Sequence, residues 1–139
     1  GAVRVFLDTS ALFKKYVAEP GSDAFDKILA TATEIAVSPI TWIELHAAVE
    51  RRVRDHTLSR AQAEWLRREA GKDFAYFLQV VWNQNLERKA VELLHRHPLK
   101  TLDAVQLASG ALSEAALFVT SDRTLYTEAQ RVVRRVLYV

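Results

Sequence analysis

The chain has 139 residues, of which 50% are hydrophobic and 26% charged, and its formal net charge is +2. This length suits one domain that buries about two-thirds of its unfolded surface, and the composition excludes a disordered chain. Cysteine is absent, which excludes disulfides, thiolate nucleophiles and cysteine metal sites. No apolar run approaches the roughly 18 residues that a membrane span requires, and the run at 3–7 is too short for an export signal. We therefore predict a single domain over 1–139 in the cytoplasm, with Gly1 a tag remnant.

Apolar runs and helical periodicities alternate along the chain. Runs rich in β-branched residues predict strands at 3–7, 35–37, 78–82, 117–120 and 136–139. Apolar residues at helical spacing predict helices at 11–17, 24–29, 40–53, 59–77, 86–95, 101–115 and 123–129. This alternation predicts an α/β fold in which helices cover both faces of a mostly parallel sheet. Such sheets bind ligands at the carboxyl ends of their strands.

Four acidic residues fall near those carboxyl ends. Asp8 directly follows the first predicted strand, and Asp122 follows the fourth. Asp103 lies in the first turn of a predicted helix and Glu44 near the start of another, both among apolar neighbours that make an uncompensated charge costly. A simpler interpretation is that Asp8 and Asp122 cap helices and that a helix dipole favours Asp103.

The convergence of all four acids favours a metal site over separate structural roles. Carboxylates in one cleft repel one another and raise their own pKa values unless a cation neutralises them. An all-oxygen cluster suits Mg²⁺ or Mn²⁺, and such ions promote phosphodiester hydrolysis. We therefore predict that Asp8, Glu44, Asp103 and Asp122 bind the metal of a phosphodiester hydrolase.

Short segments surround these acids at 7–12, 41–45, 102–108 and 119–122. They read LDTSAL, TWIEL, LDAVQLA and VTSD. In order and spacing they resemble the signature blocks of PIN-domain ribonucleases, and more narrowly those of the VapC toxins of toxin–antitoxin pairs. The resemblance implies a PIN-like α/β/α sandwich and Mg²⁺- or Mn²⁺-dependent endoribonuclease activity. It also implies a homodimer, and a cognate antitoxin that inhibits by inserting a segment into the active-site groove.

The same resemblance assigns the residues around the acids. Thr9, Ser10 and Thr120 take the flanking polar positions of the family. Lys100 stands where many members carry Arg, and Gln106 where many carry His. The positions after the last Asp where some members have a further acid hold Leu and Tyr. We therefore expect one firmly held ion and a second that is recruited only with substrate.

Basic residues supply candidate contacts to an RNA backbone. By their position near the acids, Lys14, Lys15 and Lys100 are predicted to bind substrate phosphate. For Lys14 and Lys15 the alternative is an ordinary helix surface. Arginines crowd the two middle helices, at Arg51, Arg52, Arg54, Arg60, Arg67 and Arg68. They suit a groove wall that tracks RNA, a surface for a dimer or antitoxin, or a solvated helical face.

Two other protein classes also place acids at strand ends. A phosphohydrolase would use Asp8 as a covalent nucleophile, but Ser10 stands where such enzymes commonly have a second Asp. A receiver-like signalling domain binds Mg²⁺ through clustered acids, but here Asp8 lacks an acidic neighbour and no Lys follows the last strand. Labelling of Asp8 by acetyl phosphate would separate both classes from a nuclease.

Overall fold

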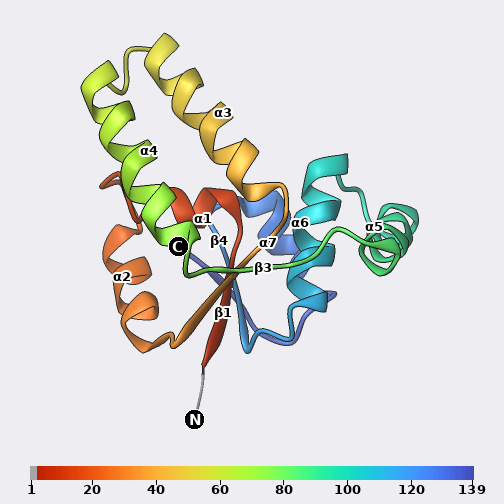
Figure 1. Ribbon diagram of the computed structural model, residues 1–139. Coiled ribbons are helices and arrows are strands. Elements are labelled where there is room, and N and C mark those ends of the chain that lie inside the picture. Colours follow the sequence, from red (N-terminus) through yellow and green to blue (C-terminus); the bar gives the residue numbers. More distant parts are fainter. Residues whose placement is uncertain (1–2) are drawn as a thin grey trace.

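A computed structural model describes residues 3–139 and confirms the alternation of strands and helices (Figure 1). The strands are β1 (Arg4–Leu7), β2 (Glu34–Val37), β3 (Leu78–Gln79), β4 (Leu117–Thr120) and β5 (Val136–Tyr138). The helices are α1 (Thr9–Phe13), α2 (Ser22–Thr31), α3 (Thr41–Arg54), α4 (Arg60–Phe74), α5 (Gln84–Arg96), α6 (Thr101–Leu112) and α7 (Arg123–Ala129). Within 3–139, none of these helices combines the length and apolarity that crossing a membrane requires. The prediction for Gly1 lies outside the described residues.

The five strands form one sheet in the order β3-β2-β1-β4-β5. Every neighbouring pair is parallel, so the sheet is wholly parallel where we predicted it to be mostly so. The chain builds outward from β1 in one direction and from β4 in the other. The crevice between β1 and β4 is therefore the topological switch point, where open α/β sheets bind ligands.

Side chains of β1 alternate between two hydrophobic cores. Val5 and Leu7 belong to a core that also holds residues of α1 to α4, whereas Phe6 belongs to a core with α5, α6 and α7. This follows from the strand geometry, because successive side chains point to opposite faces of a sheet. Figure 1 shows α2 and the α3–α4 hairpin on one side of the sheet and α5 and α6 on the other. The predicted sandwich is thus confirmed.

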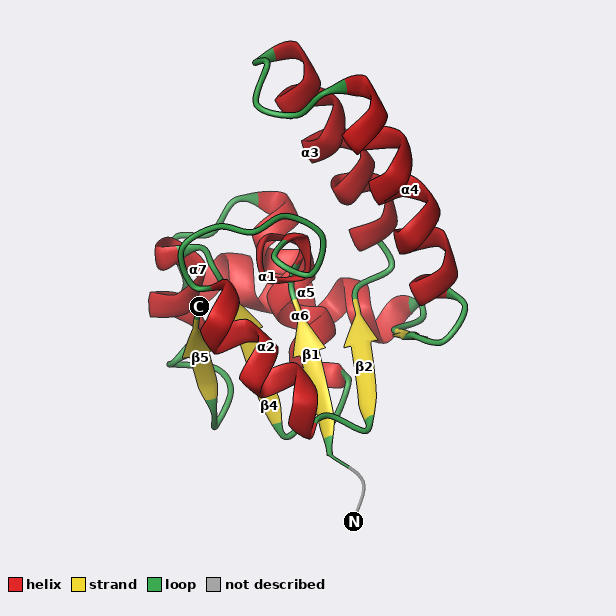
Figure 2. Cartoon of the chain, turned by 90° about the vertical axis from the view of Figure 1, so that its left-hand side faces the viewer, coloured by secondary structure: helices red, strands yellow, loops and turns green. Residues whose placement is uncertain are grey.

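The predicted pair of long helices is the α3–α4 hairpin, which projects beyond the carboxyl edge of the sheet (Figure 2). Three helices end earlier than their apolar patterns predicted, namely α1, α4 and α6. For α1, the backbone N–H groups of Lys14, Lys15 and Tyr16 each donate to a carbonyl three residues back, which tightens the chain into a turn after Phe13. Apolar periodicity continues through that turn, so the sequence pattern did not reveal the helix end.

Close packing of α6 on the sheet depends on Gly110. A Cβ atom at this position would overlap the Phe118 ring and come within 3.2 Å of Phe6 Cδ1. These two rings stack with their centroids 5.1 Å apart and are almost fully buried. Neither ring can move away without opening the core, because interiors are close-packed.

We expect Gly110→Ala to lower the free energy of unfolding by about 1–2 kcal/mol, since the overlap outweighs the helix propensity gained. Gly71→Ala in α4 is the matched control, because its new Cβ would meet only Trp42 Cη2, at 3.9 Å. Gly71→Ala should raise the free energy of unfolding by about 0.5–1 kcal/mol, because alanine has the higher helix propensity. Urea denaturation of both variants measures the two effects, and a gain from both would contradict this account of the α6 packing.

Candidate active site

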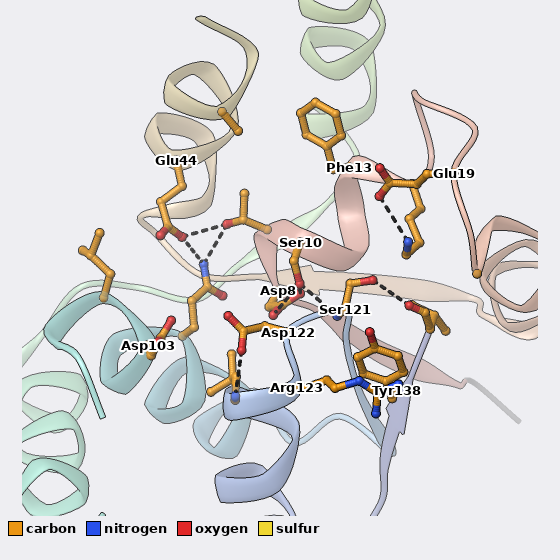
Figure 3. Close-up of a pocket in the computed structure, with 18 of the residues that line it drawn as sticks. Asp8, Ser10, Phe13, Glu19, Glu44, Asp103, Ser121, Asp122, Arg123 and Tyr138 are labelled. Carbon is orange, nitrogen blue, oxygen red and sulfur yellow. Dashed lines mark hydrogen bonds and ion pairs between the residues drawn. The ribbon is translucent and has the colours of Figure 1, made fainter. Parts of the chain in front are cut away.

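A pocket of about 860 Å³ opens at the carboxyl edge of the sheet, and all four predicted acids line it. Asp8 comes from the end of β1, Asp122 from the end of β4, and Glu44 and Asp103 from the first turns of α3 and α6. Figure 3 shows the four side chains around this pocket. The structure therefore brings together acids that are up to 114 positions apart in the sequence.

Asp8 is held rigidly at the base of the pocket. Its side chain is 3% exposed and accepts hydrogen bonds from Ser10 Oγ at 2.8 and 3.0 Å and from Thr120 Oγ1 at 2.5 Å. The backbone N–H of Ala11 donates to it at 2.8 Å, so Asp8 also caps α1. Burial raises the pKa of Asp8 from 3.8 to about 6, although the hydrogen bonds oppose this rise and the Asp122 charge adds to it. The site keeps an acid where its ionised form is disfavoured.

The same hydroxyls tie the end of β4 to the end of β1. Thr120 Oγ1 accepts from the backbone N–H of Asp122 at 3.0 Å, and Ser10 Oγ accepts from that of Ser121 at 2.9 Å. Asp122 Oδ1 accepts from the Leu125 N–H at 3.0 Å and caps α7. The capping interpretation of Asp8 and Asp122 is thus correct, and both caps lie in the shared pocket. A cap leaves the second oxygen of Asp122 available to a ligand.

Glu44 is oriented by a second polar group. Its Oε1 accepts from Thr9 Oγ1 at 2.7 Å and from Gln106 Nε2 at 2.6 Å. Gln106 Nε2 also lies 3.0 Å from Thr9 Oγ1 and 3.1 Å from Thr41 Oγ1. The carboxylate fixes the amide orientation, because the opposite orientation would place two oxygens in repulsive contact. Gln106 Oε1 is then buried and, among residues 3–139, has no hydrogen-bond partner.

Burial and the neighbouring carboxylates raise the pKa of Asp103. Its pKa is raised, first by burial and then by the charges of Asp122 and Glu44, while Lys100 acts in the opposite direction. No hydrogen bond to the Asp103 carboxylate is present within residues 3–139, so both of its oxygens are available. The carboxylates of Asp103, Asp122 and Glu44 thus line one pocket, and none of them forms an ion pair within residues 3–139.

The donor set fits a hard divalent cation. Free oxygens of Asp103, Glu44 and Asp122 supply the oxygen chemistry that Mg²⁺ or Mn²⁺ prefers. Within the described residues, no three of these acids yet surround a common point as a complete ligand set.

Comparison with known proteins places the chain in a family. The sequence profile of the PIN domain matches residues 5–129. The chain belongs to the PIN-domain family. It is 29% identical over 134 residues to Ribonuclease VapC45 of Mycobacterium tuberculosis, an alignment that covers 95% of this chain and 93% of that protein. Ribonuclease VapC49 of the same species gives the same values.

Solved structures share the fold of this PIN domain. PAE2754 from Pyrobaculum aerophilum is 25% identical with a TM-score of 0.64, and the match covers 96% of this chain and 91% of that one. A toxin–antitoxin complex from Klebsiella pneumoniae is 18% identical with a TM-score of 0.68, over 96% and 95% of the two chains. VapBC2 from Rickettsia felis, bound to a promoter DNA fragment, is 14% identical with a TM-score of 0.69, over 99% of both chains.

The three lysines predicted to bind phosphate have different surroundings in this PIN domain. Lys14 lines the pocket but is 7% exposed, and its Nζ donates to Glu19 Oε1 at 3.1 Å and to the Pro20 carbonyl at 2.6 Å. Lys15 Nζ pairs with Asp73 Oδ2 at 2.5 Å on the inner end of α4. Only Lys100 is exposed near an acid, namely Asp103. We therefore keep the phosphate-binding prediction for Lys100, because the other two ammonium groups are already engaged.

The arginines on the helical hairpin separate into two groups. Arg51 and Arg52 line the pocket of the PIN domain, and Arg52 pairs with Glu19 at 3.2 Å. Arg60 and Arg67 instead pair with Glu50, which joins α3 to α4. Of the predicted basic wall, only Arg51 and Arg52, in the last turn of α3, line the pocket.

Sequence reasoning did not single out Arg123 and Tyr138, which also line the pocket. Arg123 directly follows Asp122, and that adjacency was an available signal. Tyr138 lies in β5, and its place in the pocket depends on the pairing of β5 with β4. Nothing in the sequence predicts that pairing.

Proposed function

We propose that this PIN domain is a Mg²⁺- or Mn²⁺-dependent endoribonuclease and the toxin of a toxin–antitoxin pair. The observation that carries the proposal is one pocket lined by four carboxylates from four segments, at the switch point of a PIN sheet. The similarity of this protein, over 95% of its chain, to proteins named Ribonuclease VapC supports RNA as the substrate. Structural neighbours that are toxin–antitoxin complexes support the antitoxin partner.

Each acid has its own part in the proposed reaction. The bound cation supplies positive charge that polarises the phosphodiester and permits attack by water at neutral pH. Asp103, Glu44 and Asp122 present free oxygens to hold it. Asp8 adds negative charge from a fixed position, because Ser10 and Thr120 prevent its carboxylate from turning. Such supporting hydrogen bonds maintain ligand geometry between turnovers.

Basic side chains at the pocket rim suit a polyanionic substrate. Arg51 lines one wall, and Lys100 stands beside Asp103. Charges of this kind attract the phosphates on either side of the bond to be cut. The cation and the rim together would offset the repulsion between RNA and the acids.

The acidic pocket also suits inhibition by a partner. We propose that a cognate antitoxin places a segment in the pocket and excludes RNA, and that the active protein is a homodimer. Induced expression in bacteria should then arrest growth, and co-expression of the antitoxin should relieve the arrest. Size-exclusion chromatography with light scattering measures the proposed dimer directly, and a monomer at micromolar concentration would contradict it.

The phosphohydrolase and receiver alternatives require a reactive Asp8. The structure disfavours them, because Asp8 is 3% exposed and both of its oxygens already accept hydrogen bonds. A nucleophilic carboxylate needs an unengaged oxygen that faces the substrate. Incubation with acetyl phosphate should therefore leave Asp8 unlabelled, and a labelled Asp8 would favour the alternatives.

The function is tested by incubating the purified protein with total cellular RNA in Mg²⁺, Mn²⁺ or EDTA. We expect discrete cuts with either ion and none with EDTA, and sequencing of new 5′ ends identifies the target. Asp26→Asn, an exposed change on α2, should cut normally. Cutting that persists in EDTA would contradict metal dependence, whereas absence of cutting under all conditions would contradict the nuclease assignment.

Gln106 is expected to support the reaction by positioning Glu44. Gln106→Leu preserves volume but removes the donor 2.6 Å from Glu44 Oε1, so Glu44 can turn from its place in the pocket. We expect cleavage to fall by about 10–100-fold, as for other groups that orient metal ligands. The Mg²⁺ concentration for half-maximal rate should rise, which a purely structural role would not cause. Gln130→Leu, an exposed control that is bonded only to Tyr126 in the described structure, should change neither quantity.

A further inference from the structure

An aromatic ring and a guanidinium group stand together at one rim of the pocket. Tyr138 on β5 is 38% exposed, and Arg123 begins α7 directly after Asp122. The guanidinium carbon of Arg123 lies 4.4 Å from the centroid of the Tyr138 ring. Figure 3 shows the two side chains stacked beside Asp122 and Ser121. We call Arg123 and Tyr138 the stacking pair.

Arg123 differs in its charge balance from other arginines of the chain. Arg52 also covers a ring, that of Phe13 at 4.1 Å, but it pairs with Glu19. For Arg123, no ion pair occurs anywhere in residues 3–139, although Asp122 is its neighbour in sequence. Its positive charge at the pocket rim therefore has no ion-pair partner among the described residues.

Two neighbours, Arg123 and Tyr126, contact the ring of Tyr138. Tyr126 on α7 meets it edge-on, with centroids 5.9 Å apart and an interplanar angle of 66°. This contact and the Arg123 stack hold the ring in a defined orientation while more than a third of its surface stays open. An oriented, partly exposed ring beside an unpaired cation is the usual platform for an unpaired nucleobase.

We propose that the stacking pair binds an unpaired nucleobase of the substrate, next to the phosphodiester that the acids position. The inference rests on the proposed ribonuclease function and adds a base-binding position to it. A base within a duplex is already stacked and cannot reach the ring. The Arg123 charge would hold the phosphate of the same nucleotide, so one site contacts both base and backbone.

The test measures binding of fluorescently labelled RNA by anisotropy, with Mg²⁺ present and with Asp8→Asn in every protein so that RNA stays intact. Probes are an unpaired RNA of about ten nucleotides, the abasic chain of the same length, and a duplex. Tyr138→Ile removes the ring but puts another residue of high β-propensity in β5, and Tyr138→Phe keeps the ring. Tyr76→Ile is the matched control, since Tyr76 is 90% exposed and does not line the pocket.

We expect Tyr138→Ile to weaken binding of unpaired RNA by about tenfold, whereas Tyr138→Phe and Tyr76→Ile leave it unchanged. The abasic chain should bind both Tyr138 variants equally, because it offers no base to stack, and the duplex should bind weakly. If Tyr138→Ile binds unpaired RNA as tightly as its parent, or loses the abasic chain equally, the stacking site is wrong and the ribonuclease function stands. If the parent protein binds none of these probes, both proposals fail.

Discussion

Asp8→Asn is expected to reduce RNA cleavage by about 10²–10³-fold, the size of effect seen when one preorganised charge contact is removed from a reaction site. The change removes a negative charge next to Asp122 while the side chain keeps its shape. With less charge in the pocket, the cation binds more weakly and the substrate phosphate is less well placed. The rate is measured under single-turnover conditions with saturating Mg²⁺, on a target site mapped with the natural protein.

A loss of activity from Asp8→Asn has meaning only if the fold survives. The amide oxygen can still accept from the Ala11 N–H, and the hydroxyls of Ser10 and Thr120 can rotate to accept from the new amide. Far-ultraviolet circular dichroism should therefore match that of the natural protein. Retained cleavage in a folded variant would refute the assigned role of Asp8.

Asp8→Asn is also expected to stabilise the metal-free protein, by about 3 kcal/mol at pH 8. Burial raises the pKa of Asp8 from 3.8 to about 6, so ionised Asp8 opposes folding at neutral pH. Asparagine carries no charge and avoids this penalty. Asp8→Asn is thus expected to lower cleavage but raise stability. A residue that merely supports the fold would lose both when substituted.

The pH dependence of that stabilisation follows from the direction of the shift. Because the folded pKa of Asp8 lies above the unfolded one, the unfolded chain binds fewer protons between about pH 4 and 6. Stability of the natural protein therefore falls relative to Asp8→Asn as the pH rises through this window. Below about pH 4 Asp8 is protonated in both states, and the difference should vanish. Chemical denaturation in EDTA at pH 3.5, 5 and 8 measures it.

Asp73→Asn provides a control with the opposite sign. Asp73 accepts from Lys15 Nζ at 2.5 Å and from Tyr16 Oη at 2.7 Å, and it joins the turn after α1 to α4. Removal of its charge should lower stability at pH 8 by about 1 kcal/mol.

Added Mg²⁺ should stabilise the natural protein more than Asp8→Asn, since a ligand that binds only the native state raises its stability. If Asp8→Asn is less stable than the natural protein in EDTA at pH 8, the burial penalty assigned to Asp8 is wrong.

The order of strands and helices and the α/β class followed from the sequence alone. The three central strands, β1, β2 and β4, are short runs with residues buried on both faces of the sheet, and the helices show stripes of apolar residues, so local periodicity carries the information. The acids were found for a similar reason. Asp8 directly follows β1 and Asp122 comes two residues after β4, while Asp103 and Glu44 interrupt apolar stretches. These features are visible when the chain is read in order.

The partners of each side chain were decided only by the tertiary structure. Lys14 and Lys15 stand near Asp8 in sequence, but the tight turn after α1 directs their ammonium groups to Glu19 and Asp73. Gln106 stands where many family members carry His, and its hydrogen bond to Glu44 depends on how α6 and α3 are placed relative to each other.

Tyr138 reaches the pocket only because β5 adds to the sheet beside β4. Contacts of this kind join residues far apart in the chain, and their geometry is set by packing of whole elements. The acidic residues of the pocket can thus be predicted from the sequence of this PIN domain, because the local pattern places them at strand and helix ends. The contacts between these side chains cannot be predicted in this way, because they depend on distances that are set only when the sheet and its two helical layers have assembled.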